Sequence, residues 1–125
     1  MEEAFRAALH ADAGVKAVAG DRLDWGLRPP QLPAGRMQVV SEVPFYTAQG
    51  RDGLTPYRVQ IDCMGLTYGD AKRLARAIVA AVGRLGRPAF DACFIFESRD
   101  DHDEDASGRV VFRTSLDVRV WHHSS

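Results

Sequence analysis

Apolar residues recur at helical spacing close to the N-terminus. Phe5, Ala8 and Leu9 occupy positions i, i+3 and i+4, which predicts a short amphipathic helix over residues 2–11. A further helical turn is expected over residues 15–19, between two glycines that break the pattern. The chain therefore begins with helical structure that has one apolar side to bury.

A longer helix is predicted in the middle of the chain. Thr67 is a suitable N-cap, and Asp70 follows at the spacing of a capping box, with Asp in place of the usual Glu. The predicted apolar stripe consists of Ala71, Leu74, Ala75, Ile78, Val82 and Leu85. The opposite side of the helix is basic and carries Lys72, Arg73, Arg76 and Arg84.

Period-two alternation of apolar and polar residues predicts strands elsewhere. Residues 57–64 and 108–121 alternate most regularly, which is typical of antiparallel strands with one solvated face. Residues 36–45 and 90–97 are further strand regions, rich in Val and in Phe and Ile respectively. Residues 47–53 have turn composition and would close a long hairpin.

These elements predict the fold class. Residues 21–35 contain three prolines and are expected to form a loop or an edge segment. The polar run at residues 99–105 is expected to be a hairpin tip. The order helix, hairpin, helix, hairpin then predicts an α+β domain over residues 1–125. Its single antiparallel sheet would have about four main strands, with the helices packed on one face.

Composition excludes several classes of protein. The 125 residues suit one domain, and 30 of them are Leu, Ile, Val or Phe, which is enough for a core. The formal net charge of -1 argues against a dedicated nucleic-acid binder or a polybasic membrane protein. No apolar run approaches the length of a membrane span, and the acidic start of the chain does not resemble a signal peptide.

Candidate metal and thiol chemistry is sparse. Cys63 and Cys93 lie in apolar segments, and we interpret them as buried free thiols in a reducing compartment. The run at residues 100–105 is rich in oxygen ligands, but it lacks the glycine and the glutamate of a calcium loop. A solvated loop is therefore the preferred interpretation, and His102 has no neighbour at ligand spacing. No metal site is predicted.

Catalytic motifs are also absent from the sequence. His122 and His123 are adjacent, and on a strand they would point to opposite faces. The chain has no nucleophile elbow, no phosphate loop and no dinucleotide-binding glycine pattern. We therefore expect neither an enzyme nor a cofactor.

The distribution of charge is uneven although the total is nearly neutral. The basic side of the central helix is compatible with phosphate binding, but a solvated helix face has the same composition. Tyr68 is the only aromatic residue nearby, so single-stranded nucleic acid is a weak candidate. A basic helix face and an acidic loop would suit a subunit that docks head-to-tail on copies of itself.

Five blocks of sequence, in order, resemble a known family. They are residues 5–9 (FRAAL), 18–23 (VAGDRL), 58–63 (RVQIDC), 67–74 (TYGDAKRL) and 115–121 (SLDVRVW). The chain resembles the tail-terminator or tail-completion proteins of long-tailed phages, prophages and gene transfer agents. The order and spacing of the blocks carry the resemblance over almost the whole chain.

The resemblance implies a structural role. Such proteins form a closed ring, commonly a hexamer, on the head-proximal end of a tail tube, where they stop tube growth. The ring then offers a surface to the neck or stopper protein of the head. The expected partners are therefore other copies of the chain, the tube protein and a neck protein. The expected location is the bacterial cytoplasm during assembly and the tail–neck junction of the particle.

Projecting hairpins and polarised surfaces are the expected assembly contacts. The predicted contact residues are Arg51, Asp52, Lys72, Arg73, Arg76, Asp100, Asp101, Asp103, Glu104 and Asp105. Two alternatives remain open at this point. One is another ring-forming neck component, such as a head-completion or stopper protein. The other is a small metal- or nucleotide-dependent enzyme.

Overall fold

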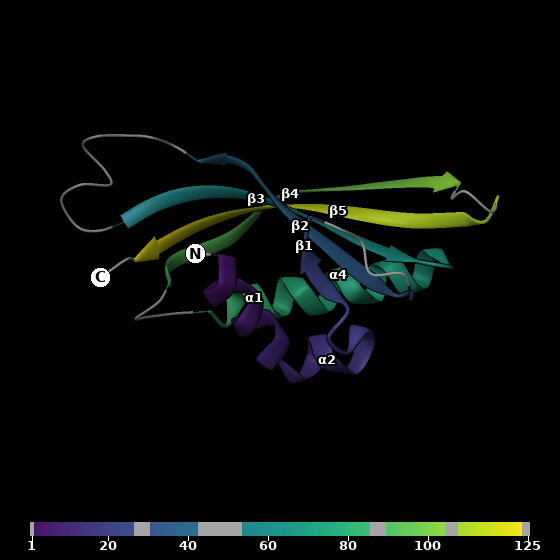
Figure 1. Cartoon of the computed structure of the whole chain (residues 1–125), viewed down its shortest axis with the longest axis horizontal. Helices are drawn as coiled ribbons and strands as arrows, with labels where there is room; N and C mark the ends of the chain where they lie inside the picture. Colours follow the sequence, from purple (N-terminus) through teal and green to yellow (C-terminus); the bar gives the residue numbers. More distant parts are fainter. Residues whose placement is uncertain (1, 27–30, 43–53, 86–89, 105–107, 124–125) are drawn as a thin grey trace.

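The structure, a computed structural model, describes residues 2–26, 31–42, 54–85, 90–104 and 108–123. Figure 1 shows one sheet with its helices gathered on one side. The helices are α1 (Glu2–Ala11), α2 (Ala13–Ala19) and α4 (Tyr68–Gly83). The strands are β1 (Leu23–Trp25), β2 (Ala34–Glu42), β3 (Leu54–Gly65), β4 (Phe90–Glu104) and β5 (Val110–His123).

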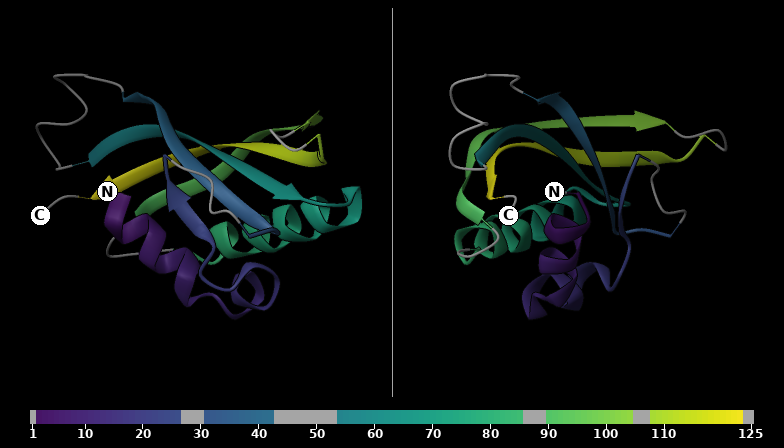
Figure 2. Two further views of the ribbon diagram at one scale, coloured as in Figure 1. Left: turned by 45° about the vertical axis from the view of Figure 1, so that its right-hand side comes forward. Right: turned by 60° about the vertical axis from the view of Figure 1, so that its left-hand side comes forward.

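The sheet has five strands in the order β1-β2-β3-β5-β4. The two predicted hairpins, β2–β3 and β4–β5, are both present and antiparallel, and β3 joins them by pairing with β5. Figure 2 shows the same layering from two further sides, with all helices under one face. The α+β class, with helices on one side of a single sheet, is therefore confirmed.

The expected antiparallel sheet of about four main strands has in addition a fifth, parallel strand at one edge. β1 lies in the segment expected to be a loop or an edge, and it pairs in parallel with β2, Leu23 opposite Gly35. A side chain at residue 35 would collide with Leu23. Glycine at this position therefore makes room for the Leu23 side chain, which is fully buried.

Both amphipathic helices are confirmed by what they bury. Phe5 and Leu9 of α1 are fully buried, and so are Leu74 and Ile78 of α4. Together with the inward residues of β3 and β5 they form one core. The other α4 stripe residues inside this core are Ala75 and Val82, with Leu85 partly buried against it.

Local signals explain where these helices begin and end. The Thr67 hydroxyl accepts a hydrogen bond from the Asp70 amide at 3.1 Å, as the predicted N-cap requires. Gly20 follows α2 with a φ of 59°, a left-handed conformation that glycine adopts without strain. A Cβ at Gly65 would lie 2.8 Å from the Ala71 amide nitrogen. Glycine at residue 65 therefore lets the start of α4 lie close against β3.

The predicted tip at residues 99–105 is wrong in its position. β4 continues to Glu104, which pairs with Val110 of β5, so most of the acidic run is strand. Cross-strand partners make this tolerable, because Asp101 lies opposite Arg113 and opposite charges on paired strands attract. The predicted turn with Arg51 and Asp52 lies outside the described residues. So does Asp105, and the side chain of Asp103 is not described.

Candidate functional site

The outer face of the sheet, the face opposite the helices, carries a carboxylate at its centre. Asp62 of β3 is only 1% exposed. Its carboxylate accepts hydrogen bonds from Arg36 at 2.7 Å, Ser115 at 2.7 Å and Gln60 at 2.9 Å. β2, β3 and β5 thus each contribute a donor to one buried anion.

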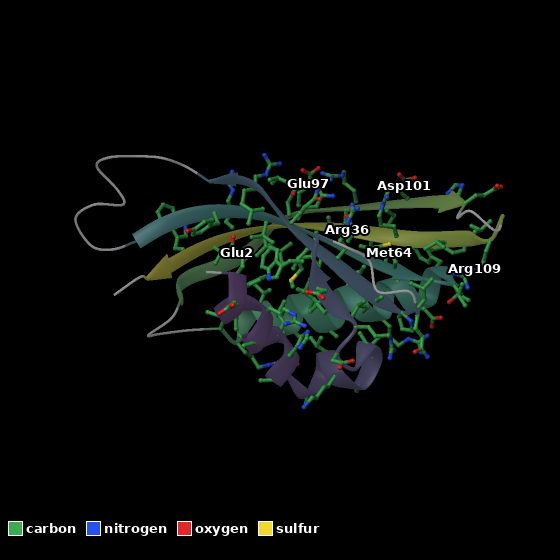
Figure 3. The ribbon with its side chains drawn as sticks, in the orientation of Figure 1. Glu2, Arg36, Met64, Glu97, Asp101 and Arg109 are labelled. Carbon is green, nitrogen blue, oxygen red and sulfur yellow. The ribbon has the colours of Figure 1, made fainter. Side chains whose placement is uncertain are left out.

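A second buried carboxylate lies on the same face. Asp117 of β5 is 2% exposed, and its Oδ2 atom lies 3.3 Å from Arg58 and 3.3 Å from Arg99. Arg99 also approaches Glu97 at 3.6 Å. Figure 3 shows Glu97 and Asp101 on this helix-free side of the sheet. Charged side chains from four neighbouring strands therefore cross-link the outer face.

Electrostatics keep the first of these carboxylates ionised. Burial alone would raise the pKa of Asp62, but the hydrogen bonds from Ser115, Gln60 and Arg36 outweigh it and lower the pKa below the usual value. All of these donors come from the chain itself. The geometry therefore supports a structural polar network and not an acid, a base or a metal ligand.

The sequence pattern did not predict this network. It predicted a solvated polar face, because Asp62 and Asp117 alternate with apolar residues. The available signal was the residue type, since Asp is depleted in strands and is unexpected in the middle of a long one. Arginines on neighbouring strands lie over the carboxylates, and this explains how polar positions on an uncovered face become buried.

On the helix side, a different cluster ties α4 to the β4–β5 hairpin. Lys72 approaches Asp100 at 2.8 Å, and the Tyr68 hydroxyl donates to the same carboxylate at 3.0 Å. Thr114 adds a third bond at 3.0 Å. The hydrogen bond between Lys72 and Asp100 raises the pKa of Lys72 and lowers the pKa of Asp100.

These contacts show where the charged residues predicted as assembly contacts lie within the chain. Lys72 pairs with the acidic strand of its own chain, and its role in assembly remains a prediction. Arg73 pairs with Asp70 at 2.6 Å. Arg84 likewise pairs with Asp12 at 2.6 Å. Among the described residues, Arg76 is the basic residue of α4 that makes no ion pair or hydrogen bond.

The acidic residues of β4 likewise divide into those that are paired within the chain and one that is not. Asp100 and Asp101 are engaged within the chain, the latter with Arg113 at 2.9 Å. Glu104 is exposed and has no partner among the residues the structure describes. Its cross-strand neighbour Val110 alternates in step with the buried Leu116 and Val118 of β5, but 40% of it is exposed.

Exposed apolar side chains gather around this end of the hairpin. Leu66 is 45% and Tyr68 51% exposed, and the Tyr68 ring packs edge-on against Phe112 at 6.4 Å. We call the surface of Leu66, Tyr68, Glu104 and Val110 the hairpin-end site. A second surface, the helix site, consists of Arg76 and Val79 of α4, and 42% of Val79 is exposed.

Other candidate chemistry is not assembled in the part of the chain that is described. A surface depression of about 610 Å³ lies beside α1 and α2, lined by residues that include Arg6, His10 and Lys16. The His10 ring is hydrogen-bonded to the Leu23 carbonyl at 2.8 Å. Within the described ranges, no three His, Cys, Asp or Glu side chains are placed to hold a metal ion.

The structure bears on two predictions made from the sequence, one about the cysteine thiols and one about membrane spans. Cys63 is a free, buried thiol, and burial raises its pKa. The side chain of Cys93 lies outside the described ones. No helix among the described residues has the length and apolar character needed to cross a membrane.

Comparison with known proteins gives one family and a solved structure. The family described as "Tail completion protein gp17" matches residues 3–123. The comparison with curated protein sequences found no match. Among solved structures, a chain of the "Virion of native gene transfer agent (GTA) particle" is similar, with a TM-score of 0.62 and 18% sequence identity. The similarity covers 94% of this chain and 90% of that one, and it shows a shared fold.

Proposed function

This chain belongs to the tail completion protein gp17 family, and we propose that within it the chain acts as a tail terminator. Membership in this family makes the chain a structural protein of a phage-type tail and not an enzyme. Such a protein works in contact with other tail and head components. The proposal adds the finer role. The chain would close as a ring, a hexamer, on the head-proximal end of a tail tube and stop its growth there.

The observation that carries this proposal is the extent of the family match. It runs over residues 3–123, and so includes every helix and strand described above except the first residue of α1. The fold shared with a chain of a gene transfer agent virion supports it independently of sequence. The self-contained polar network supports a structural role as well, because its buried carboxylates are already satisfied by the chain.

The mechanism follows from how tubes and rings assemble. A growing tube adds subunits because each ring presents the surface on which the next one forms. A terminator must match that surface on one side and must not reproduce it on the other. The ring closes when one surface of each copy binds a different surface of the next with a rotation that returns to the start. Its free side would receive the neck protein of the filled head.

Deleting the gene tests the proposed role. We expect filled capsids without tails, and free tails of abnormal length, because uncapped tube ends keep adding subunits and offer no surface to the neck. Particles are counted and tails measured by electron microscopy, with the gene restored from a plasmid as the control. Joined particles with tails of normal length from the deletion strain would overturn the assignment.

The same experiment separates the terminator from a head-completion or stopper protein. Loss of a stopper would leave tails of normal length beside capsids that have lost their genome. Loss of a terminator leaves filled capsids and tails of variable length. Location in the bacterial cytoplasm during assembly, and at the tail–neck junction afterwards, belongs to the same proposal.

A further inference from the structure

The hairpin-end site and the helix site have matching compositions. Each combines exposed apolar surface with one charge that has no partner among the described residues. At the hairpin end these are Val110 and Glu104, which are cross-strand neighbours on one face of the sheet. On α4 they are Val79 and Arg76, which lie three residues apart and therefore on one side of the helix.

The hairpin end extends beyond the helices that cover the rest of the sheet. At the start of α4, Tyr68 and Lys72 contact the hairpin at Asp100 and Phe112. In Figure 1 and the right-hand view of Figure 2, β5 begins beyond the start of α4, whereas in the left-hand view of Figure 2 α4 projects further than the strands. Val110 occupies a core-facing register position, but 40% of it is exposed, so the described helices do not cover it completely.

The two sites cannot meet within one chain. Val79 lies eleven positions after Tyr68, the first residue of α4, which corresponds to about 16 Å along a helix axis. The hairpin end lies beyond that start, on the side away from Val79. Contact between the sites therefore needs two copies.

We infer that neighbouring copies in the assembly contact each other head-to-tail, with Val110 and Glu104 of one copy against Val79 and Arg76 of the next. The α4 helix of one copy then continues the helix layer under the uncovered hairpin end of its neighbour. The contact uses two different surfaces of each chain, so it is heterologous and can close into a ring. This inference rests on the proposed ring.

Charge complementarity is the reason to choose a second copy as the occupant. Glu104 and Arg76 have opposite signs and remain unpaired among the described residues, whereas Lys72, Arg73, Asp100 and Asp101 are satisfied within the chain. The exposed valines beside them would be removed from water in the same contact, which favours association.

A charge-swap experiment tests the contact. The variants are Glu104→Arg, Arg76→Glu and the two together, and native mass and ring counts by negative-stain microscopy give the degree of assembly. Each single reversal should raise the dissociation constant about tenfold, because like charges would face each other across the contact. The double variant should return to within about threefold of the original chain, because the pair is restored with its signs exchanged.

Two controls make the rescue specific. Lys16 of α2 is exposed and lies outside both sites, so Glu104→Arg combined with Lys16→Glu should stay as defective as Glu104→Arg alone. Circular dichroism should show all variants folded, since the changed residues are exposed. If the free chain is monomeric, rings are counted on purified tail tubes instead.

The outcomes separate this inference from the proposed function. Rings that form normally with both single reversals would overturn the contact and leave the terminator role standing. Single reversals that weaken tube binding but leave ring formation unchanged would also overturn the contact between copies. They would indicate that the two sites bind the tube protein. If the original chain forms no ring, either free or on tubes, both the proposed ring and the inferred contact are overturned.

Discussion

β5 has two regions with the same alternation of residues and opposite outcomes. In its middle, around Leu116 and Asp117, both the apolar and the polar positions are buried, the first under α4 and the second under arginines. At its beginning, Val110 is apolar and yet exposed. Alternation therefore fixes which side of a strand a residue occupies, but what lies over that side decides whether the residue is buried.

The difference also separates stability from assembly. In the middle of the sheet, the buried carboxylates of the outer face and the apolar residues of the inner face find their partners within the chain. The hairpin end keeps an unpaired charge among the described residues and partly exposed apolar side chains, and the inferred contact between copies rests on these features. Substitutions in the first region should therefore act on unfolding, and those in the second on association.

The largest difference is expected between two truncations on the core-facing side of β5. Leu116→Ala should lower the free energy of unfolding by about 2–5 kcal/mol, because it leaves a cavity in the core. Val110→Ala should change it by about 1 kcal/mol or less, because 40% of the residue is already exposed to water. Urea denaturation of both variants measures this, and equal losses would mean that the hairpin end is covered within the chain.

A smaller effect is expected from the buried carboxylate of the outer face. Asp62→Asn keeps the size of the side chain but leaves Arg36 without its anion, which should cost about 2–3 kcal/mol at neutral pH. Asp101→Asn, which changes an exposed carboxylate on the same face, should unfold at nearly the same urea concentration as the original chain.

The contribution of Asp62 to the free energy of unfolding should depend on pH in a definite direction. The pKa of Asp62 is lower in the folded chain than in the unfolded one, so its stabilising effect is complete above the unfolded pKa of about 4. It is lost as the pH falls from there through the folded pKa. The gap between the original chain and Asp62→Asn should therefore narrow below about pH 4. A gap that stays constant down to pH 2 would show that the charge does not contribute.

Much of the fold could be predicted because its signals are local. The bounds of α1, the Thr67 cap and the apolar stripe of α4 depend on neighbours within a few residues, and all are confirmed. The two hairpins follow from alternation and turn composition in adjacent segments. The family resemblance, confirmed over residues 3–123, came from the order of such local blocks.

The missed features depend on residues far apart in sequence. Asp62 is buried by Arg36 and Ser115, which lie 26 and 53 residues away. Lys72 finds Asp100 only because β4 extends past the length that its apolar residues suggest. No periodicity within one segment indicates such pairs. The predicted contact role of the charged residues remains a prediction, now directed to Arg76 and Glu104.

The smallest expected effect concerns the boundary between the two regions. Lys72 and Asp100 form an ion pair between α4 and the hairpin, and both are partly exposed. Lys72→Met keeps the aliphatic part of the side chain and removes the charge, so the free energy of unfolding should fall by only about 0–1 kcal/mol. The local effect should be larger than the global one. Amide hydrogen exchange should become faster in residues 98–104 and 110–114, where the strands would lose their tie to the helix, and should stay unchanged around Leu116. Arg73→Met, which removes a cation of the same helix that pairs with Asp70 and not with the hairpin, is the matched control. Equal exchange in both variants would mean that strand pairing alone holds the hairpin end in place, and that the covered region of the sheet ends at Leu116 and not at Asp100.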